Sequence, residues 1–356
     1  MHQPAARPRN RRELIVDAAG RVFNERGYHA TSMEEIAQRV GITAPALYRH
    51  FPNKYALFAE CANAMADGLL DVLEGLPDDT GLEVMLAAVA RETLAHRSSG
   101  GVYRWEARYL EADDRRTLRT TFERIVERVA GAVPAGSAFD AGLRASAALG
   151  AIGSITMHRT RVAPPRAQAL LVAAAVGAGS VPDAHHCPTR ASLPTLVAPR
   201  TRRDEILAAS IPLFERDGFH QVALGQIAQE VGIVTSAIYR HFPAKVDILA
   251  AACEQAGELL GQAVERALAQ PTSPPEAVAA LTTAYVAHSF EHRALTSVAE
   301  AELVGMPPAL QGPLIAAQRD HIRVWVQHLR TARPELDAQQ ATVLVHAAFG
   351  VVVESG

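Results

Sequence analysis

One basic, hydroxyl-bearing string occurs twice in this 356-residue chain, and its side chains have the chemistry needed to hold phosphate groups. The first copy is Tyr48-Arg49-His50-Phe51-Pro52-Asn53-Lys54, and the second is Tyr239-Arg240-His241-Phe242-Pro243-Ala244-Lys245. Arginine and lysine carry positive charge, and together with tyrosine and histidine they donate hydrogen bonds to phosphate oxygens. Lys54 and Lys245 are the two lysines of the sequence and lie 191 residues apart, so the string marks a duplicated unit.

The duplicated unit is longer than this string. Aligned without a gap, residues 11–58 and 202–249 share 20 identical residues over 48 positions. Beyond residue 58 the similarity fades, although an apolar pattern at helical spacing continues in both halves. Between the halves, residues 179–200 contain four prolines and no clear apolar period, which is typical of a linker.

The repeat and the linker predict an all-α chain made of two tandem units. Hydrophobic residues make up 49% of the sequence and aromatic residues 5%, which favours helical bundles over sheets. The predicted domains are a first helix-turn-helix at 1–58, a first bundle at 59–178, the linker at 179–200, a second helix-turn-helix at 201–249, and a second bundle at 250–356.

Local signals place the repeated string at the end of a helix-turn-helix. Gly27 is a fitting left-handed end for a first helix, and Ser32-x-x-Glu35 forms a capping box that opens a second. Gly41 ends this short helix, and Thr43 is a suitable N-cap for a third. Two short helices joined in this way, after a longer packing helix, leave the second short helix able to enter a major groove of DNA.

The first unit resembles the N-terminal DNA-binding unit of the TetR family of transcriptional regulators. The resemblance rests on Thr31-Ser32-Met33-Glu34-Glu35-Ile36-Ala37 and on the run from Val40-Gly41-Ile42-Thr43 to Phe51-Pro52-Asn53-Lys54. It covers about 48 residues in each half. The rest of each half matches the family only as a helical array, which the resemblance implies to be a ligand-binding and dimerisation bundle.

The resemblance implies roles for the residues of the reading surface. Base edges would be read by Ala44, Pro45, Ala46 and Tyr48, and phosphates would be held by Arg49, His50, Lys54 and the helix start at Thr31 and Ser32. The predicted set for the first head adds Arg11 and Thr43. For the second head it is Arg202, Val234, Thr235, Ser236, Ala237, Tyr239, Arg240, His241 and Lys245. We expect Arg49 and an N-terminal arm with Arg7, Arg9, Arg11 and Arg12 to supply much of the affinity.

The second copy departs from the first in ways that predict weaker DNA binding. Thr31-Ser32 becomes Val222-Ala223, and Glu34 becomes Gly225, which weakens a helix by about 1 kcal/mol relative to alanine. Residues 1–58 hold nine Arg+Lys and five Asp+Glu (+4), whereas residues 192–249 hold six of each (zero). The alternative to two working heads is one working head, with the second half kept as a dimerisation partner or ligand sensor.

A chain with two heads can assemble in two ways. It can form an intramolecular pseudo-dimer, or two tandem chains can form a homodimer with four heads. Helices are predicted around Asp140–Arg159 and Pro165–Ala178, the pair that forms the dimer bundle in the family. The second half stops near the end of the helix that corresponds to Asp140–Arg159, so a counterpart of Pro165–Ala178 is missing. We therefore expect either a truncated chain or an asymmetric bundle.

Other residues with suitable chemistry are weaker candidates. A ligand cavity is predicted from mid-bundle polar and aromatic residues, namely Trp105, Glu106, Arg108 and Tyr109 in the first half and Ser297, Glu300 and Glu302 in the second. His185-His186-Cys187 lies in the linker without a partner motif, so no metal site is predicted. His96, His158, His288 and His346 are expected to be structural.

The remaining features narrow the class of protein. No phosphate loop, nucleophile elbow or zinc helix signature is present, so an enzyme is not predicted, and neither is a cofactor. No apolar run is long enough to span a bilayer, and three scattered cysteines fit a reducing cytoplasm. We expect a ligand-responsive repressor that binds double-stranded operator DNA and is released by a small, apolar effector.

Overall fold

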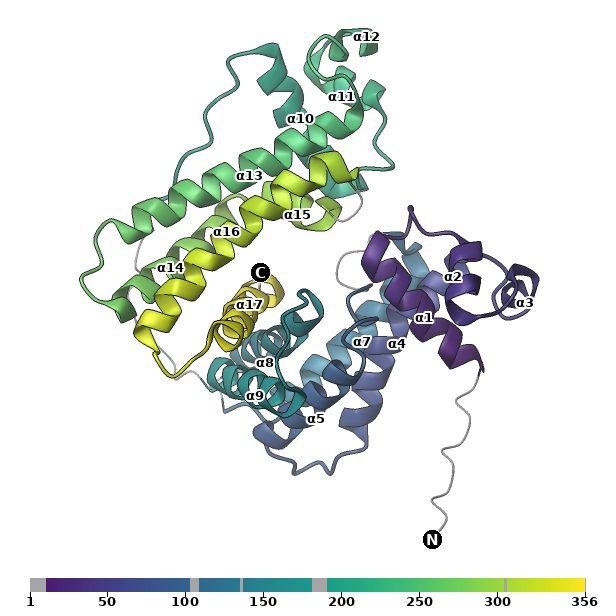
Figure 1. Cartoon of the computed structure of the whole chain (residues 1–356), viewed down its shortest axis with the longest axis vertical. Coiled ribbons are helices and arrows are strands. Elements are labelled where there is room, and N and C mark those ends of the chain that lie inside the picture. The colour runs from purple at the N-terminus through teal and green to yellow at the C-terminus, as the bar shows by residue number, and fades with distance from the viewer. Residues whose placement is uncertain (1–10, 103–108, 135–136, 181–190, 304–305, 356) are drawn as a thin grey trace. The chain divides into compact units, whose positions relative to one another are not determined.

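The computed structural model describes residues 11–102, 109–134, 137–180, 191–303 and 306–355 (Figure 1). Within these ranges the chain is helical and contains no β-strand, as the sequence predicts. The chain divides into two compact units, Met1–Ala132 and Val133–Gly356. None of the described helices is both long and apolar enough to cross a membrane.

The first unit consists of a small head and the helices that follow it. The head contains α1 (Arg11–Arg26), α2 (Met33–Val40) and α3 (Ala44–Tyr48), and it packs on the long helix α4 (Lys54–Glu74). Helices α5 (Leu82–Ala95) and α7 (Ala112–Ala130) pack against α4. Helix α4 therefore belongs both to the head and to the bundle.

The core of the first head comes from the apolar stripe of α1. Ile15 and Phe23 are 0% and 1% exposed, and they are joined by Ile36 of α2 and Leu47 of α3, both 0% exposed. Phe23 meets the ring of Phe58 on α4 edge-on, with 5.5 Å between ring centroids. Burying four or five such side chains, at about 1.5–3 kcal/mol each, gives the short helices α2 and α3 a stability that they would lack alone.

The second unit contains the second head and its bundle. The head comprises α10 (Arg202–Asp217), α11 (Leu224–Val231) and α12 (Thr235–Ile238), packed on α13 (Lys245–Leu268). Helices α14 (Pro274–Glu291), α15 (Arg293–Glu302) and α16 (Pro308–Ala332) complete the bundle. Ile206, Phe214, Ile227, Ile238 and Phe242 repeat the core of the first head.

The second unit also joins helices from both sequence halves. Helices α8 (Ala138–Gly153) and α9 (Pro164–Gly179) precede the linker, and they pack against α17 (Ala338–Ser355) at the end of the chain (Figure 1). The crossing is closest at Gly150 and Gly350. A Cβ on either glycine would overlap the other's carbonyl oxygen and lie 2.9 Å from the Cβ of Glu354 or Ser154, respectively.

These close contacts are reciprocal, because Gly150 and Ser154 correspond to Gly350 and Glu354 at a constant offset of 200 residues. Helices α8 and α17 are thus related by a local pseudo-twofold axis. Small residues permit this approach, since larger ones would force the backbones apart.

The predicted helix around Asp140–Arg159 was placed correctly, but it is shorter than expected. It ends at Gly153 and is followed by a 3-10 turn, Ser154–Thr156. The hydroxyls of Ser154 and Thr156 donate to the carbonyl oxygens of Ala151 and Gly153 at 2.7 and 2.8 Å. Such side-chain bonds compete with the α-helical pattern.

Candidate nucleic-acid interface

The turn between the two short helices has the same geometry in both heads. Gly41 and Gly232 adopt left-handed conformations, with φ of 73° and 68°. Ile42 N donates to Ala37 O, and Ile233 N donates to Ala228 O, both at 2.9 Å. These bonds fix the crossing of α2 with α3 and of α11 with α12, and the left-handed turn favours glycine.

The third helix of each head has a buried side and an exposed side. Leu47 and Ile238 are 0% and 1% exposed and face the core, whereas Tyr48 and Tyr239 are 46% and 56% exposed. Most of the predicted reading residues share this outer side: Thr43, Pro45, Tyr48 and Arg49 are exposed in the first head, as are Val234, Thr235, Ser236, Tyr239 and Arg240 in the second. Ala44, Ala46, His50, Ala237 and His241 are half-buried.

The lysine of each string lies against the protein's own backbone. Lys54 Nζ donates to Tyr28 O at 2.9 Å and to Thr31 O at 3.0 Å, and it lies 4.4 Å from the centroid of the Tyr28 ring. The ammonium group ties the start of α4 to the turn after α1. This arrangement gives Lys54 a structural role beside the phosphate contact that the sequence predicts.

Lys245 repeats this arrangement in the second head. Its Nζ donates to Phe219 O at 2.6 Å and Val222 O at 2.8 Å, and it lies 4.4 Å from the centroid of the Phe219 ring. Burial lowers the pKa of Lys245, and the nearby carboxylate of Glu302 opposes this shift. We call the two arrangements, around Lys54 and Lys245, the lysine clamps.

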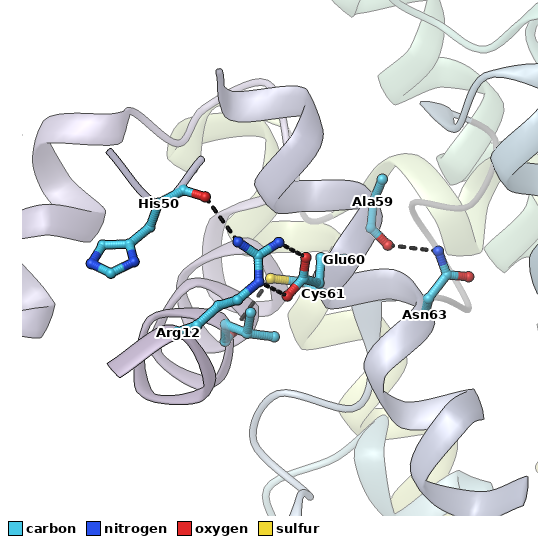
Figure 2. Close-up of polar contacts among 7 residues, drawn as sticks. Arg12, His50, Ala59, Glu60, Cys61 and Asn63 are labelled. Carbon is cyan, nitrogen blue, oxygen red and sulfur yellow. Dashed lines mark hydrogen bonds and ion pairs between the residues drawn. The ribbon is translucent and has the colours of Figure 1, made fainter. Parts of the chain in front are cut away.

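A second repeated contact involves arginine and the phenylalanine of the string. Arg12 lies 4.3 Å from the centroid of the Phe51 ring, and Arg203 lies 4.1 Å from that of Phe242. Arg12 also donates to His50 O at 2.9 Å and forms an ion pair with Glu60 of α4 (Figure 2). The guanidinium therefore joins α1, the end of the third helix and α4.

Arg12 was predicted to belong to a DNA-contacting arm, and its internal contacts with Phe51, His50 and Glu60 were not predicted. The signal was available, because both members of the Arg–Phe pair are identical in the two copies at the same spacing. Arg7 and Arg9 lie outside the described residues. Arg11 is exposed at the start of α1, while Arg202 pairs with Glu205 and donates weakly to Val231 O at 3.4 Å.

The residues predicted at the start of the second helix differ in environment. The Thr31 hydroxyl is buried and donates to Gly27 O at 2.8 Å. Ser32 is exposed and accepts from Glu35 N at 3.2 Å, which makes it the predicted N-cap. In the second head Ala223 has no such oxygen, and instead its N–H donates to Gln226 Oε1 at 2.7 Å. The second head thus keeps half of the capping box.

Four of the predicted pocket residues lie in the described part of the chain: Tyr109 in the first unit, and Ser297, half-buried Glu300 and Glu302 in the second. Trp105, Glu106 and Arg108 lie outside the described residues, and Ser297 is exposed. The ring of Tyr109 lies 4.6 Å from that of His29, and buried Glu302 accepts from Phe219 N at 3.1 Å. Tyr109 and Glu302 therefore each contact the turn after the first helix of their own head.

A cleft of about 1050 Å³ lies between α1, α4 and α5 of the first unit. Acidic residues dominate its charged lining, which includes Glu13, Asp17, Glu60, Asp67 and Glu92. Burial and the neighbouring Asp71 raise the pKa of Asp67. Because the Arg12–Glu60 pair borders this cleft, a molecule bound there would contact the junction of head and bundle. Among the described residues, no group of three histidine, cysteine or acidic side chains could hold a metal ion.

Comparison with known proteins agrees with the two heads seen in the structure. The family model "Bacterial regulatory proteins, tetR family" matches residues 15–61 and again 206–252. Two curated relatives are the transcriptional activator FasR of Mycolicibacterium smegmatis, 43% identical over 60 residues, and the transcriptional repressor KstR2 of Rhodococcus jostii, 31% identical over 124 residues. These alignments cover 17% and 32% of this chain, and 27% and 61% of the relatives. Each therefore spans less than two thirds of the relative's length.

A solved structure of the regulator PfmR from Thermus thermophilus is similar, with 21% identity and a TM-score of 0.41. It covers 49% of this chain and 98% of the other. The fold and the two reading surfaces define a helix-turn-helix protein with two heads. Both heads match the TetR family, so the chain contains two TetR-like units in one polypeptide.

Proposed function

We propose that this protein is a sequence-specific, DNA-binding transcriptional regulator that acts in the cytoplasm and engages DNA with both heads. The observation that carries the proposal is the duplicated reading surface. In each head a tyrosine and an arginine stand exposed beside a third helix whose other side is buried. Exposed arginine at a helix-turn-helix suits phosphate contact, while Thr235 and Ser236 give the second head hydrogen-bonding groups that Ala44 and Pro45 lack.

The two heads act as an intramolecular pseudo-dimer in this proposal. Its support is the crossing of α8 with α17, in which helices from the two sequence halves make reciprocal contacts at Gly150 and Gly350. Helix-turn-helix dimers place two recognition helices in successive major grooves about 34 Å apart. Because the two heads differ in sequence, their operator consists of two unlike half-sites.

Regulation is by a small-molecule effector that releases the operator, so that the protein is a repressor. KstR2 is named as a repressor, which favours repression over activation for this protein, whereas FasR is named as an activator. The long helices α4 and α13 each carry a lysine clamp at one end and bundle contacts along their length. An effector that binds better to the non-binding arrangement would shift the population away from DNA.

A second candidate is a protein with one working head. It is favoured by the neutral charge of residues 192–249, compared with +4 for residues 1–58, and by the missing N-cap hydroxyl at Ala223. In that case the second half serves as a dimerisation partner or ligand sensor.

Selection of random duplexes by the purified chain tests both candidates. We expect an enriched motif with two unlike half-sites. Replacing Arg240 by alanine is expected to remove one half-site, and Arg49→Ala the other. If Arg240→Ala keeps both the operator affinity and its salt dependence, the candidate with one working head is favoured. If no duplex is enriched even at low salt, the proposal of a DNA-binding regulator is overturned.

A further inference from the structure

The bundle of the second unit contains a buried polar layer between two apolar clusters. The larger buried side chains along α14, the residue between the helices and the start of α15 are Leu281, Tyr285, His288, His292 and Leu295. Leu281 and Tyr285 belong to a cluster with Trp325 and Phe349, and Leu295 belongs to another with Ile211 and Leu259. The two histidines, 2% and 5% exposed, interrupt the apolar sequence between these clusters.

Three polar atoms of this layer have no hydrogen-bond partner among the described residues. They are Nδ1 of His288, Nδ1 of His292 and Oγ1 of Thr296. A buried polar group left without a partner is destabilising, and native proteins seldom leave several together. His292 is the residue between α14 and α15, and its carbonyl oxygen accepts from Thr296 N at 2.9 Å in the first turn of α15. The rings of His288 and His292 lie 5.0 Å apart between centroids, so the three residues are neighbours.

The hydrogen bonds of the layer define which chemical group would satisfy it. His292 Nε2 lies 3.3 Å from the carbonyl oxygen of Pro194, and a carbonyl can only accept, so this nitrogen carries the proton. In this tautomer the lone pair lies on Nδ1. A partner at this site must therefore donate to His292, while Thr296 can donate in return.

The surroundings disfavour a charged partner. Trp325 Nε1 donates to His321 Nε2 at 3.1 Å, which makes that nitrogen an acceptor as well. Burial and the neighbouring histidines lower the pKa of His288 to about 4, and burial lowers that of His321 to about 4, so both rings are neutral near pH 7. The buried residues of the described chain include no arginine or lysine that could pair with an anion.

We infer that this polar layer, around His288, His292 and Thr296, is a binding site for a neutral molecule with an apolar body and one hydroxyl group, an alcohol or a phenol. The hydroxyl donates to His292 Nδ1 and accepts from the Thr296 hydroxyl. Its apolar body packs against the cluster that contains Tyr285 and Trp325. The binding site itself does not depend on the proposed function. Only the role of this molecule as the effector rests on the proposed function.

Fluorescence of Trp325 offers a direct test with the full-length chain. The sequence has two tryptophans, so a Trp105→Phe variant leaves Trp325 as the only one. The probes are para-cresol and cyclohexanol, each compared with its counterpart without a hydroxyl, toluene and methylcyclohexane. We expect saturable binding of the hydroxyl compounds, at least about tenfold tighter than that of the counterparts, as one good hydrogen bond provides.

Two substitutions in the same background identify the atoms. His292→Phe and Thr296→Val should each weaken cresol binding about fivefold to tenfold while the toluene affinity stays unchanged. The matched control is Thr282→Val, because Thr282 is exposed on α14 and its hydroxyl bonds its own helix at 2.9 Å. Circular dichroism confirms that each variant is folded.

Equal binding of cresol and toluene, or no binding of either, would overturn the inference and leave buried water as the partner of these atoms. The operator supplies an independent readout. If cresol binds and the operator complex is unaffected, the site stands and ligand-controlled release fails. If no duplex is bound at all, the DNA-binding proposal fails while the fluorescence result remains valid.

Discussion

Both lysines of the chain place their ammonium groups among backbone carbonyl oxygens of the turn after the first helix of a head. Lys54 bonds the carbonyl oxygens of Tyr28 and Thr31, and Lys245 bonds those of Phe219 and Val222. Any residue has a backbone carbonyl group, so the sequence does not reveal that these oxygens accept from the lysines. The repeated string by itself therefore predicts only a phosphate contact. The duplicated geometry favours a further role, which is to fix the angle between head and long helix.

Replacing Lys54 by methionine separates these roles. We expect the free energy of unfolding to fall by about 1–3 kcal/mol, because partly buried carbonyls lose a charged donor. Urea denaturation measures this effect. Arg49→Met is the control: Arg49 is exposed, so stability should change by less than about 0.5 kcal/mol, while the salt slope of DNA binding falls by about one. Unchanged stability in Lys54→Met would show that the clamp contributes little.

The buried histidines predict a pH dependence. The pKa of His288 is lowered from 6.5 to about 4 in the folded chain, so the unfolded chain binds more protons between these values. The stability that depends on His288 is therefore complete above pH 6.5 and is lost as the pH falls toward 4, by about 2 kcal/mol between pH 7.5 and pH 5, and His321, whose pKa is also lowered to about 4, adds to this loss. Urea midpoints at both pH values measure this loss.

His288→Phe should reduce that loss, whereas His328→Phe, at a partly exposed position of α16, should leave it unchanged. An identical pH profile in wild type and His288→Phe would show that His288 is not its source.

The helices of the two heads show how much the sequence could predict at the level of elements. The signals at Gly27, Gly41 and Thr43 were confirmed: both glycines are left-handed, and Thr43 Oγ1 accepts from Ala46 N at 3.4 Å at the start of α3. These features are local, so short stretches of sequence carry them.

Contacts between distant segments were harder to predict. The pairing of Arg12 with Phe51, and of α8 with α17, joins residues far apart in the chain. The 200-residue offset between α8 and α17 is visible in the sequence, because Ala147-Ala148-Leu149-Gly150 corresponds to Ala347-Ala348-Phe349-Gly350. Because the offset differs from the 191 residues between the heads, a single-offset comparison does not find it.

Gly225 offers a test of the weaker second head. A Cβ at this exposed position of α11 would lie 3.8 Å from the Thr235 hydroxyl, in ordinary contact. Gly225→Ala should raise the stability of the head by about 0.5–1 kcal/mol through lower unfolded-state entropy. Hydrogen exchange of the α11 amides measures it. Gly232→Ala, where φ is 68°, should instead destabilise, and equal effects of the two changes would contradict this reasoning.

At the scale of the molecule, the proposed pseudo-dimer depends on the crossing of α8 and α17. Gly150→Leu should separate these helices, at a cost of about 1–3 kcal/mol for overpacking. We expect lower operator affinity and a larger radius of gyration, measured by titration and small-angle X-ray scattering. Gly142→Leu is the control, since nothing lies within 4 Å of a Cβ there.

Sedimentation completes this test. The wild-type chain should sediment at its own mass of 38.1 kDa and bind the operator one chain per duplex. Two chains per duplex would favour the homodimer of tandem chains.

The Gly150–Gly350 contact joins parts of a single polypeptide, so dilution does not separate them. A regulator assembled from two separate chains loses its paired form when few copies are present, and its occupancy of DNA then rises with the square of its abundance. In the proposed pseudo-dimer, a tethered pair keeps its partner at any copy number. We therefore expect its gene to give a graded response even at a very low level of expression, and each half to remain able to diverge toward its own half of the operator.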